Sequence, residues 1–187
     1  MNMYIFKFIS FFAIITFFFV ALISCKGNNS RPEAALNYFS RRLENNDLDE
    51  VALTIYYMSP FVLTRMPVSV SDLRDGMHEY RVVVESSELK EHIDLLRTFT
   101  SESLISAEQR GGINARIYYV FETASGHKLI DVVMWSEHGN IIVNGYEFKR
   151  DDVFYDIIMP FLPERAYSEI RAFLSHGIMG YRELLND

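Results

Sequence analysis

Apolar positions in the first part of the chain recur at the spacing of helices. Residues 31–44 and 47–59 each place apolar side chains three or four positions apart, which is the period of an amphipathic helix. In the first stretch these positions are Ala35, Leu36, Phe39 and Leu43, and in the second they are Leu48, Val51, Ala52 and Ile55. A short Asn45-Asn46 turn separates the two stretches, so the pattern predicts an N-terminal helical hairpin.

The middle and the end of the chain alternate between strand and helix patterns. Residues 61–66 could form a short strand ended by a proline, and residues 80–85 alternate as a strand does. Residues 87–99 return to helical spacing. At the C-terminus we expect two more helices, over residues 152–159 and 163–177, with a glycine closing the second.

Residues 113–148 carry the clearest strand pattern, because alternating runs are separated by the hairpin signals Ser125-Gly126 and Asn144-Gly145. The first of these turns sets a register that joins six apolar residues on one face: Phe121 with Ile130, Tyr119 with Val132, and Ile117 with Met134. A slip by one residue would turn the polar set inward instead. The pattern therefore predicts an antiparallel β-meander, and the whole fold belongs to the α+β class.

The opposite face of this predicted meander mixes aromatic and charged side chains. They include Arg116, Tyr118, Glu122, Asp131 and Trp135. Aromatic residues and arginine are enriched in protein contact surfaces, so these five are the candidate binding residues. Alternatively, one of the amphipathic helices covers this face.

The start of the chain has the composition of an export signal. Seventeen uncharged, mostly apolar residues, 8–24, follow Lys7 and precede the only cysteine. The end of this segment, Leu22-Ile23-Ser24-Cys25, resembles the lipobox of bacterial lipoproteins, in which a signal peptidase cuts before the cysteine and its sulfur is acylated. The resemblance implies a signal peptide over residues 1–24 and a lipidated Cys25 that begins a short polar tether over residues 25–30.

Two other interpretations of this segment stay open. An uncleaved anchor would make a helix of about 26 Å, slightly short of a hydrocarbon core of about 30 Å. An ordinary cleaved signal would leave Cys25 incidental, and it fits less well because no A-x-A-like site marks a better cleavage point. Every one of these interpretations places the rest of the chain outside the cytoplasm. A disulfide framework is not expected there, because it needs an even set of cysteines.

Residues 31–187 have the length of one domain with a proper core. The whole chain has a net charge of −7, and its lysines and arginines form no basic stripe. This balance argues against nucleic acid as a partner. It suits a basic partner, or simply a solvated acidic surface.

Metal and nucleophilic chemistry find little support in the pattern. His127 and His138 stand at opposite ends of the predicted strand 128–136, which puts them roughly 30 Å apart at about 3.3 Å per residue. The chain contains no H-E-x-x-H and no G-x-S-x-G. Glu122 and Asp131 could act as an acid/base pair on the mixed face. We expect no metal and no cofactor, and we favour binding over catalysis.

The opening of the predicted domain, PEAALNYFSRRLENNDLDEVA at residues 32–52, is similar to the start of cystatin-like and NTF2-like domains of bacterial lipoproteins. This resemblance implies a small α+β domain and assigns no site residues. We therefore expect a lipoprotein anchored in the bacterial cell envelope, at the outer membrane or cell surface, that binds an envelope or secreted protein or a small ligand. An inhibitor or immunity protein would act in this way. The alternatives are an exported hydrolase and a purely structural envelope component.

Overall fold

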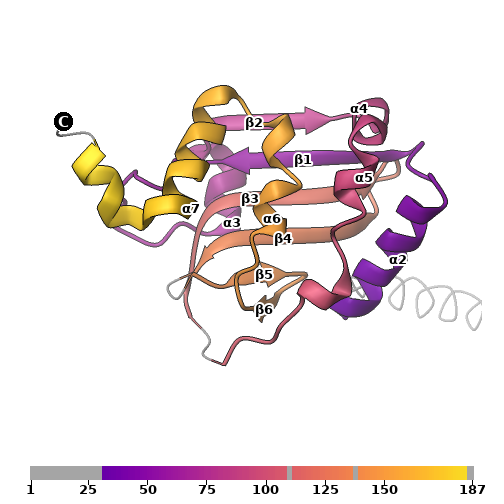
Figure 1. The fold of residues 1–187 in the computed structure, drawn as a ribbon, viewed down its shortest axis with the longest axis horizontal. Coiled ribbons are helices and arrows are strands. Elements are labelled where there is room, and N and C mark those ends of the chain that lie inside the picture. The colour runs from indigo at the N-terminus through magenta and orange to yellow at the C-terminus, as the bar shows by residue number, and fades with distance from the viewer. Residues whose placement is uncertain (1–30, 109–110, 137–138, 185–187) are drawn as a thin grey trace, which may run out of the picture.

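One antiparallel sheet organises the chain (Figure 1). The computed structural model describes residues 31–108, 111–136 and 139–184. Within them the strands are β1 (Val51–Tyr57), β2 (Tyr80–Val84), β3 (Ile113–Thr123), β4 (Lys128–Ser136), β5 (Ile141–Val143) and β6 (Tyr146–Phe148). They lie in the order β2-β1-β3-β4-β5-β6, so β1 is an inner strand and β2 and β6 are the edges.

Most of the helices cover one face of this sheet. The helices are α2 (Pro32–Glu44), α3 (Val70–Asp72), α4 (Ser86–Glu91), α5 (Ile93–Leu96), α6 (Val153–Asp156) and α7 (Glu164–Leu184), with the π-helical and 3-10 turns η1 (Leu73–Met77), η2 (Ser101–Ser103) and η3 (Met159–Phe161). Figure 1 shows α5, α6 and α7 in front of the sheet and α3 behind it. The predicted α+β class is therefore confirmed. None of the helices in the described part of the chain has the length and apolar character needed to cross a membrane.

Residues 51–57 form the strand β1, so the prediction of an N-terminal helical hairpin is wrong. The apolar positions of this stretch also fit a period of two, because Val51, Leu53, Ile55 and Tyr57 are all buried. Its β-branched and aromatic residues favour a pleated strand. β1 pairs with β2 on one side and with β3 on the other. These long-range partners satisfy its backbone on both sides and override the helical spacing.

β3 and β4 pair in the register that the turn between them predicts. Three of the observed pairs are Ile117 with Met134, Tyr119 with Val132, and Phe121 with Ile130. All six side chains are fully buried on the helical side of the sheet. At the turn end of the pair the register shifts beyond Phe121, where Glu122 faces Lys128.

Aromatic rings fill the space between the sheet and its helices. Phe39 of α2 lies with its ring centroid 4.6 Å from that of Phe121 on β3. Phe99 meets Phe154 of α6 edge to face at 5.1 Å. Such tilted and edge-on contacts are the preferred geometries of aromatic pairs. They hold α2 against β3 and α6 against the chain that follows α5.

Several element boundaries differ from the sequence prediction. Residues 61–66 form no strand, and the helix expected over residues 87–99 is divided into α4 and α5 at His92, whose φ is −109°. The helix α7 continues through Gly177 to Leu184. A glycine inside a helix costs only about 1 kcal/mol relative to alanine, so it does not by itself end one. The predicted signal, Cys25 and the tether over residues 25–30 lie outside the described residues.

Candidate functional site

The face of the sheet opposite the helices is largely covered by the segment between β1 and β2. Tyr118 and Val133 on this face are buried against Val68 and Leu73 of that segment. The cover therefore consists of a loop and the short helical turns after it, not of one of the amphipathic helices. We call residues 58–69 the β1–α3 loop.

Arg116 is buried beneath this loop and is not a surface contact residue, because only 4% of it is exposed. Its Nη2 donates to the carbonyl oxygen of Val62 and to Oγ1 of Thr64, both at 3.2 Å. Its Nη1 donates to Oδ1 of Asn114 at 2.8 Å. Burial lowers the pKa of the guanidinium from its usual value. Arg116 thus fixes the β1–α3 loop to β3.

The base of the β1–α3 loop is held by further bonds to β3. The amide of Val68 donates to Oδ1 of Asn114 at 3.1 Å, and the carbonyl of Val68 accepts from the amide of Ala115 at 2.8 Å. The tip between these fixed points exposes its large apolar side chains, with Leu63 79% exposed and Met66 75% exposed. Exposed apolar side chains gathered on one fixed element are typical of contact surfaces.

Three of the five predicted binding residues come together on this face of the sheet. The hydroxyl of Tyr118 donates to Oδ2 of Asp131 at 3.5 Å, and Nζ of Lys128 lies 3.0 Å from the same oxygen. Glu122 is close enough for its charge to act on Tyr118. Burial raises the pKa of Tyr118, and the Asp131 carboxylate raises that pKa further. At neutral pH Tyr118 is therefore a protonated hydrogen-bond donor and a poor base, while Lys128 balances the charge of Asp131.

One oxygen of this group has no partner among the described residues. Oδ1 of Asp131 is buried and accepts no hydrogen bond from any of them. The backbone of Asp131 is bonded twice to Asn144, through its amide to Oδ1 at 2.9 Å and through its carbonyl to the amide at 3.0 Å. Asp131 is therefore held in place, with one buried carboxylate oxygen that accepts no hydrogen bond from the described residues.

Trp135 lies on the other side of the sheet from Tyr118. Its backbone is left-handed, with φ at 83°, which breaks the alternation that the sequence pattern assumes. The ring centroid of its indole lies 3.8 Å from that of Phe173 and 6.2 Å from that of Tyr155. The structure therefore does not join Trp135 to the predicted binding face. It brings together Tyr118, Glu122 and Asp131, whereas Arg116 is bonded to the β1–α3 loop and Trp135 lies on the other face.

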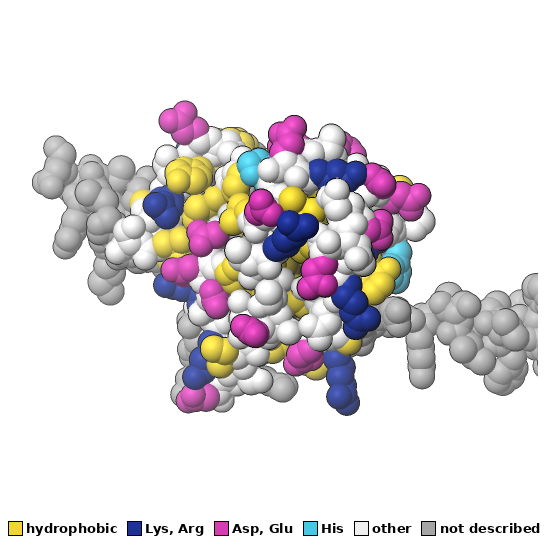
Figure 2. Space-filling view, turned by 45° about the vertical axis from the view of Figure 1, so that its right-hand side comes forward, with side chains coloured by type: hydrophobic (Ala, Val, Ile, Leu, Met, Phe, Trp, Pro, Cys, Tyr) yellow, Lys and Arg dark blue, Asp and Glu magenta, His cyan; other side chains and the backbone are white. Residues whose placement is uncertain are grey.

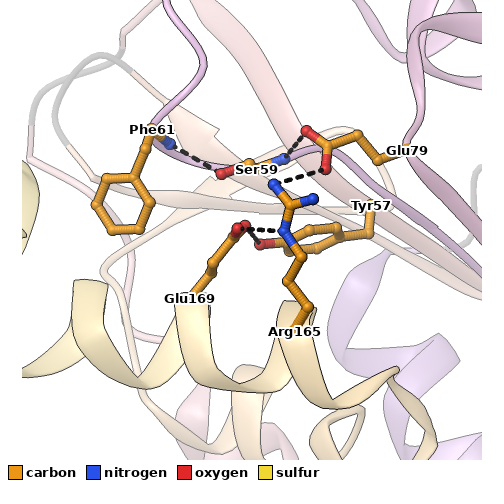
Figure 3. Close-up of polar contacts among 6 residues, drawn as sticks. All are labelled: Tyr57, Ser59, Phe61, Glu79, Arg165 and Glu169. Atoms are coloured by element: carbon orange, nitrogen blue, oxygen red, sulfur yellow. Dashed lines mark hydrogen bonds and ion pairs between the residues drawn. The ribbon is translucent and has the colours of Figure 1, made fainter. Parts of the chain in front are cut away.

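A second polar group, which the sequence pattern did not reveal, lies on the helical side of β1 (Figure 3). The hydroxyl of Tyr57 donates to Oε2 of Glu169 at 2.7 Å, and Nε of Arg165 donates to Oε1 of the same carboxylate at 2.9 Å. Arg165 also lies 4.0 Å from Oε2 of Glu79, whose Oε1 accepts from the amide of Ser59 at 3.2 Å. These bonds join α7 to β1 and to the chain before β2.

The chemistry of this network is that of a structural lock. Burial raises the pKa of the Tyr57 hydroxyl, and its bond to Glu169 raises that pKa further. A phenol held in its protonated form donates a strong, charge-assisted bond to a buried carboxylate. The available signal in the sequence was the four-residue spacing of Arg165 and Glu169, which suits an ion pair on one helix face. The pattern does not indicate its partner Tyr57, because it predicts a helix over residues 47–59.

A hollow of about 470 Å³ lies between β6 and the start of α2. Its lining includes the acidic side chain of Glu33, the aromatic rings of Tyr146 and Phe148, and Ile142. Glu147 also lines it, but the amide of Gly111 already donates to that carboxylate at 3.1 Å. Few polar groups are left to orient a ligand, and sites for small molecules depend on such groups.

The charged side chains of the described residues were compared with two arrangements, a basic stripe and a metal-binding cluster. In Figure 2, acidic and basic side chains are scattered over the face in view, and no basic stripe gathers there. Within residues 31–108, 111–136 and 139–184, no group of three or more His, Cys, Asp and Glu side chains is placed to hold a metal ion. No protein-family model, curated protein or solved structure matches this chain. A function for this chain is therefore inferred from its sequence and from the geometry of the described residues.

Proposed function

We propose that this protein is a lipid-anchored lipoprotein of the bacterial cell envelope, and that its α+β domain binds another protein through the β1–α3 loop. The observation that carries the proposal is the buried Arg116 beneath an exposed apolar tip. Exposed Leu63 and Met66 contribute little burial to the fold. A buried arginine that fixes the loop carrying them is therefore best explained by a contact that the loop makes with a partner.

The energetics favour a preformed contact of this kind. Burying a large apolar side chain contributes about 1.5–3 kcal/mol relative to leaving it in water. A loop that is already fixed loses less conformational freedom on binding, so more of that gain appears as affinity. The bonds from Arg116 to Val62, Thr64 and Asn114, and the two at Val68, supply this fixation before any partner arrives.

The place of the loop supports a protein partner rather than the anchoring membrane. Figure 1 shows α2 at the end of the sheet where β1 begins and the β1–α3 loop at the end where β1 finishes. A chain tethered through Cys25 enters the domain at α2, so the loop would face away from its own membrane. The net charge of −7 suits a basic partner, such as the target of an inhibitor or immunity protein.

The anchor is tested by the intact mass of the membrane-extracted protein, measured for the wild type and for Cys25→Ala. The proposal expects the wild type to lack residues 1–24 and to carry added acyl mass, and expects the variant to carry none. An unmodified Cys25 in the wild type would contradict the proposed lipid anchor. It would not bear on the proposed binding of a protein through the β1–α3 loop.

The binding role is tested by a crosslinking pull-down of the anchored protein. We expect the wild type to recover a partner that the double variant Leu63→Ser/Met66→Ser fails to recover. The matched control is Ile105→Ser, another exposed apolar position, 56% exposed and outside the loop. Equal recovery by the wild type and the double variant would exclude the loop as the contact surface.

A further inference from the structure

The two edge strands of the sheet, β2 and β6, differ in whether another segment covers their outer side. At β6 the segment before β3 lies along the edge, because the amide of Lys149 donates to the carbonyl of Ile105 at 2.7 Å and Ser106 bridges to Phe148. At β2 no described residue sends a hydrogen bond to the outer side of the strand backbone. Figure 1 shows β2 as the outermost strand of the sheet. Within the described chain, one edge is thus covered and the other is open.

The open edge lacks the proline, the lysine and the bulge that often block an edge strand. β2 reads Tyr-Arg-Val-Val-Val, without proline, lysine or glycine. It pairs with β1 over five consecutive residues with no bulge. The extended backbone continues into Glu85, with φ at −82° and ψ at 162°. An unprotected edge of this kind is a template for another strand.

The side chains along this edge form a charge pattern that is complementary to itself. Arg81, Val83 and Glu85 stand two positions apart, so they point to the same face, and all three are exposed. Arg81 lies over the ring of Tyr56 at 5.7 Å and donates to its hydroxyl at 3.4 Å. Neither Arg81 nor Glu85 forms an ion pair with any residue in the described ranges. An acid and a base therefore flank an exposed valine, and neither is paired with an opposite charge from the described chain.

We propose that β2 pairs in antiparallel fashion with β2 of a second copy of this chain, about a two-fold axis at Val83. Val83 then faces Val83 of the second copy, and Arg81 of each chain faces Glu85 of the other. Residues directly opposite in an antiparallel pair share a face, and opposite charges there are favourable. The pairing joins the two sheets into one continuous sheet.

Two registers shifted toward the start of β2 are worse. An axis at Val82 places Glu79 opposite Glu85 of the second copy, and an axis at Arg81 places the two Arg81 side chains opposite each other. Both arrangements set like charges directly across the strand pair, which is destabilising. The axis at Val83 also brings Val82 beside Val84 of the second copy on the helical side, where β-branched residues pack well. The proposal leaves the β1–α3 loop untouched, so it holds or fails independently of the proposed function.

Site-specific crosslinking in the full-length protein, extracted in mild detergent, tests the pairing. Val83→Cys is treated with a short bismaleimide and separated under denaturing conditions, and we expect a covalent dimer at twice the mass of the monomer in the same sample. The matched control is Ile113→Cys, because Val83 is 42% exposed and Ile113 is 43% exposed. The unsubstituted chain shows how much crosslinking Cys25 contributes. A dimer yield for Val83→Cys no higher than for Ile113→Cys would overturn the proposal.

Charge exchange then tests the register in the same crosslinking assay. Arg81→Glu and Glu85→Arg should each weaken the dimer about tenfold, because two opposite-charge pairs become two like-charge pairs. The double variant Arg81→Glu/Glu85→Arg should restore the dimer, because its charge pairs are again opposite. If the single variants were weak because they fold poorly, the double variant would not recover. A double variant as weak as the single variants would overturn the register. If the Val83→Cys variant crosslinks mainly to a different polypeptide, the second copy is overturned as the occupant of this edge.

Discussion

The hydroxyl oxygen of Tyr57 lies 2.7 Å from Oε2 of Glu169, although 112 positions separate the two residues in the chain. Tyr57 is the last residue of β1, and Glu169 lies in the second turn of α7. Tyr57 is fully buried and Glu169 is 8% exposed. This one bond therefore joins an inner strand of the sheet to the C-terminal helix.

Removing the Tyr57 hydroxyl should loosen this connection. Tyr57→Phe leaves Oε2 of Glu169 buried without its donor, which should lower the free energy of unfolding by about 1–3 kcal/mol. Urea unfolding at neutral pH measures the change. Tyr167→Phe is the matched control, since Tyr167 is 40% exposed and should change stability by less than about 0.5 kcal/mol. Equal losses in the two variants would mean that the bond to Glu169 does not stabilise the fold.

The same tyrosine should give the protein a specific loss of stability at alkaline pH. Burial and the bond to Glu169 raise the pKa of Tyr57 far above its ordinary value of about 10. Above that pH the unfolded chain releases a proton that the folded chain keeps, so the free energy of unfolding falls as pH rises. The contribution is fully present below about pH 10 and then declines by up to about 1.4 kcal/mol per pH unit.

Comparison with Tyr57→Phe isolates this contribution from the other groups that titrate in the same range. The stability advantage of the wild type over the variant should shrink between about pH 10 and pH 11, as measured by urea unfolding at each pH. A constant difference across that range would show that Tyr57 ionises equally well in the folded and unfolded chains.

Arg116 should control the order of the β1–α3 loop. Arg116→Met removes the donors to Val62 and Thr64 and keeps much of the apolar stem, so amide hydrogen exchange should accelerate in residues 60–68. The unpaired acceptors should also lower global stability by about 1–3 kcal/mol. Arg65→Met, at an exposed arginine of the same loop, should leave exchange unchanged. Unchanged exchange in Arg116→Met would show that the loop is held by other contacts.

Trp135 provides an optical test of which face it occupies, because it is the only tryptophan in the chain. Phe173→Ala removes the ring whose centroid lies 3.8 Å from that of Trp135, so the emission should shift to longer wavelength and its quenching by acrylamide should increase. Tyr118→Phe, on the opposite face, should leave the emission unchanged. If Tyr118→Phe moves the emission and Phe173→Ala does not, Trp135 lies with Tyr118 after all.

Features set by neighbours close in sequence were predictable, and those set by distant partners were not. The turn at Ser125-Gly126 lies between two alternating runs, and it fixes the pairing of Tyr119 with Val132 without help from elsewhere. β1 was mistaken for a helix because its short apolar run fits both periods. Its pairing with residues 117–123, which makes it an inner strand, is not visible in the local pattern.

In the candidate site, too, the contacts between residues distant in the sequence could not be predicted. Alternation placed Arg116 and Tyr118 on one face, but only the fold brings Val62 over Arg116, from 54 positions away. Trp135 lies on the other face, and its backbone has a left-handed φ of 83°. A tryptophan in the sequence does not indicate such an angle, because positive φ is uncommon for residues other than glycine. The prediction at Cys25 lies outside the described residues and depends on the sequence alone.

The most direct test of the central claim is photo-crosslinking from the tip of the β1–α3 loop in intact cells. A photoreactive amino acid replaces Leu63 in the full-length chain, and the same photoreactive residue replaces Ile105 in a parallel strain. The account predicts one discrete protein adduct from position 63, no such adduct from position 105, and loss of the adduct when Arg116→Met is added. Absence of any protein adduct from position 63, or the same adducts from both positions, would contradict it.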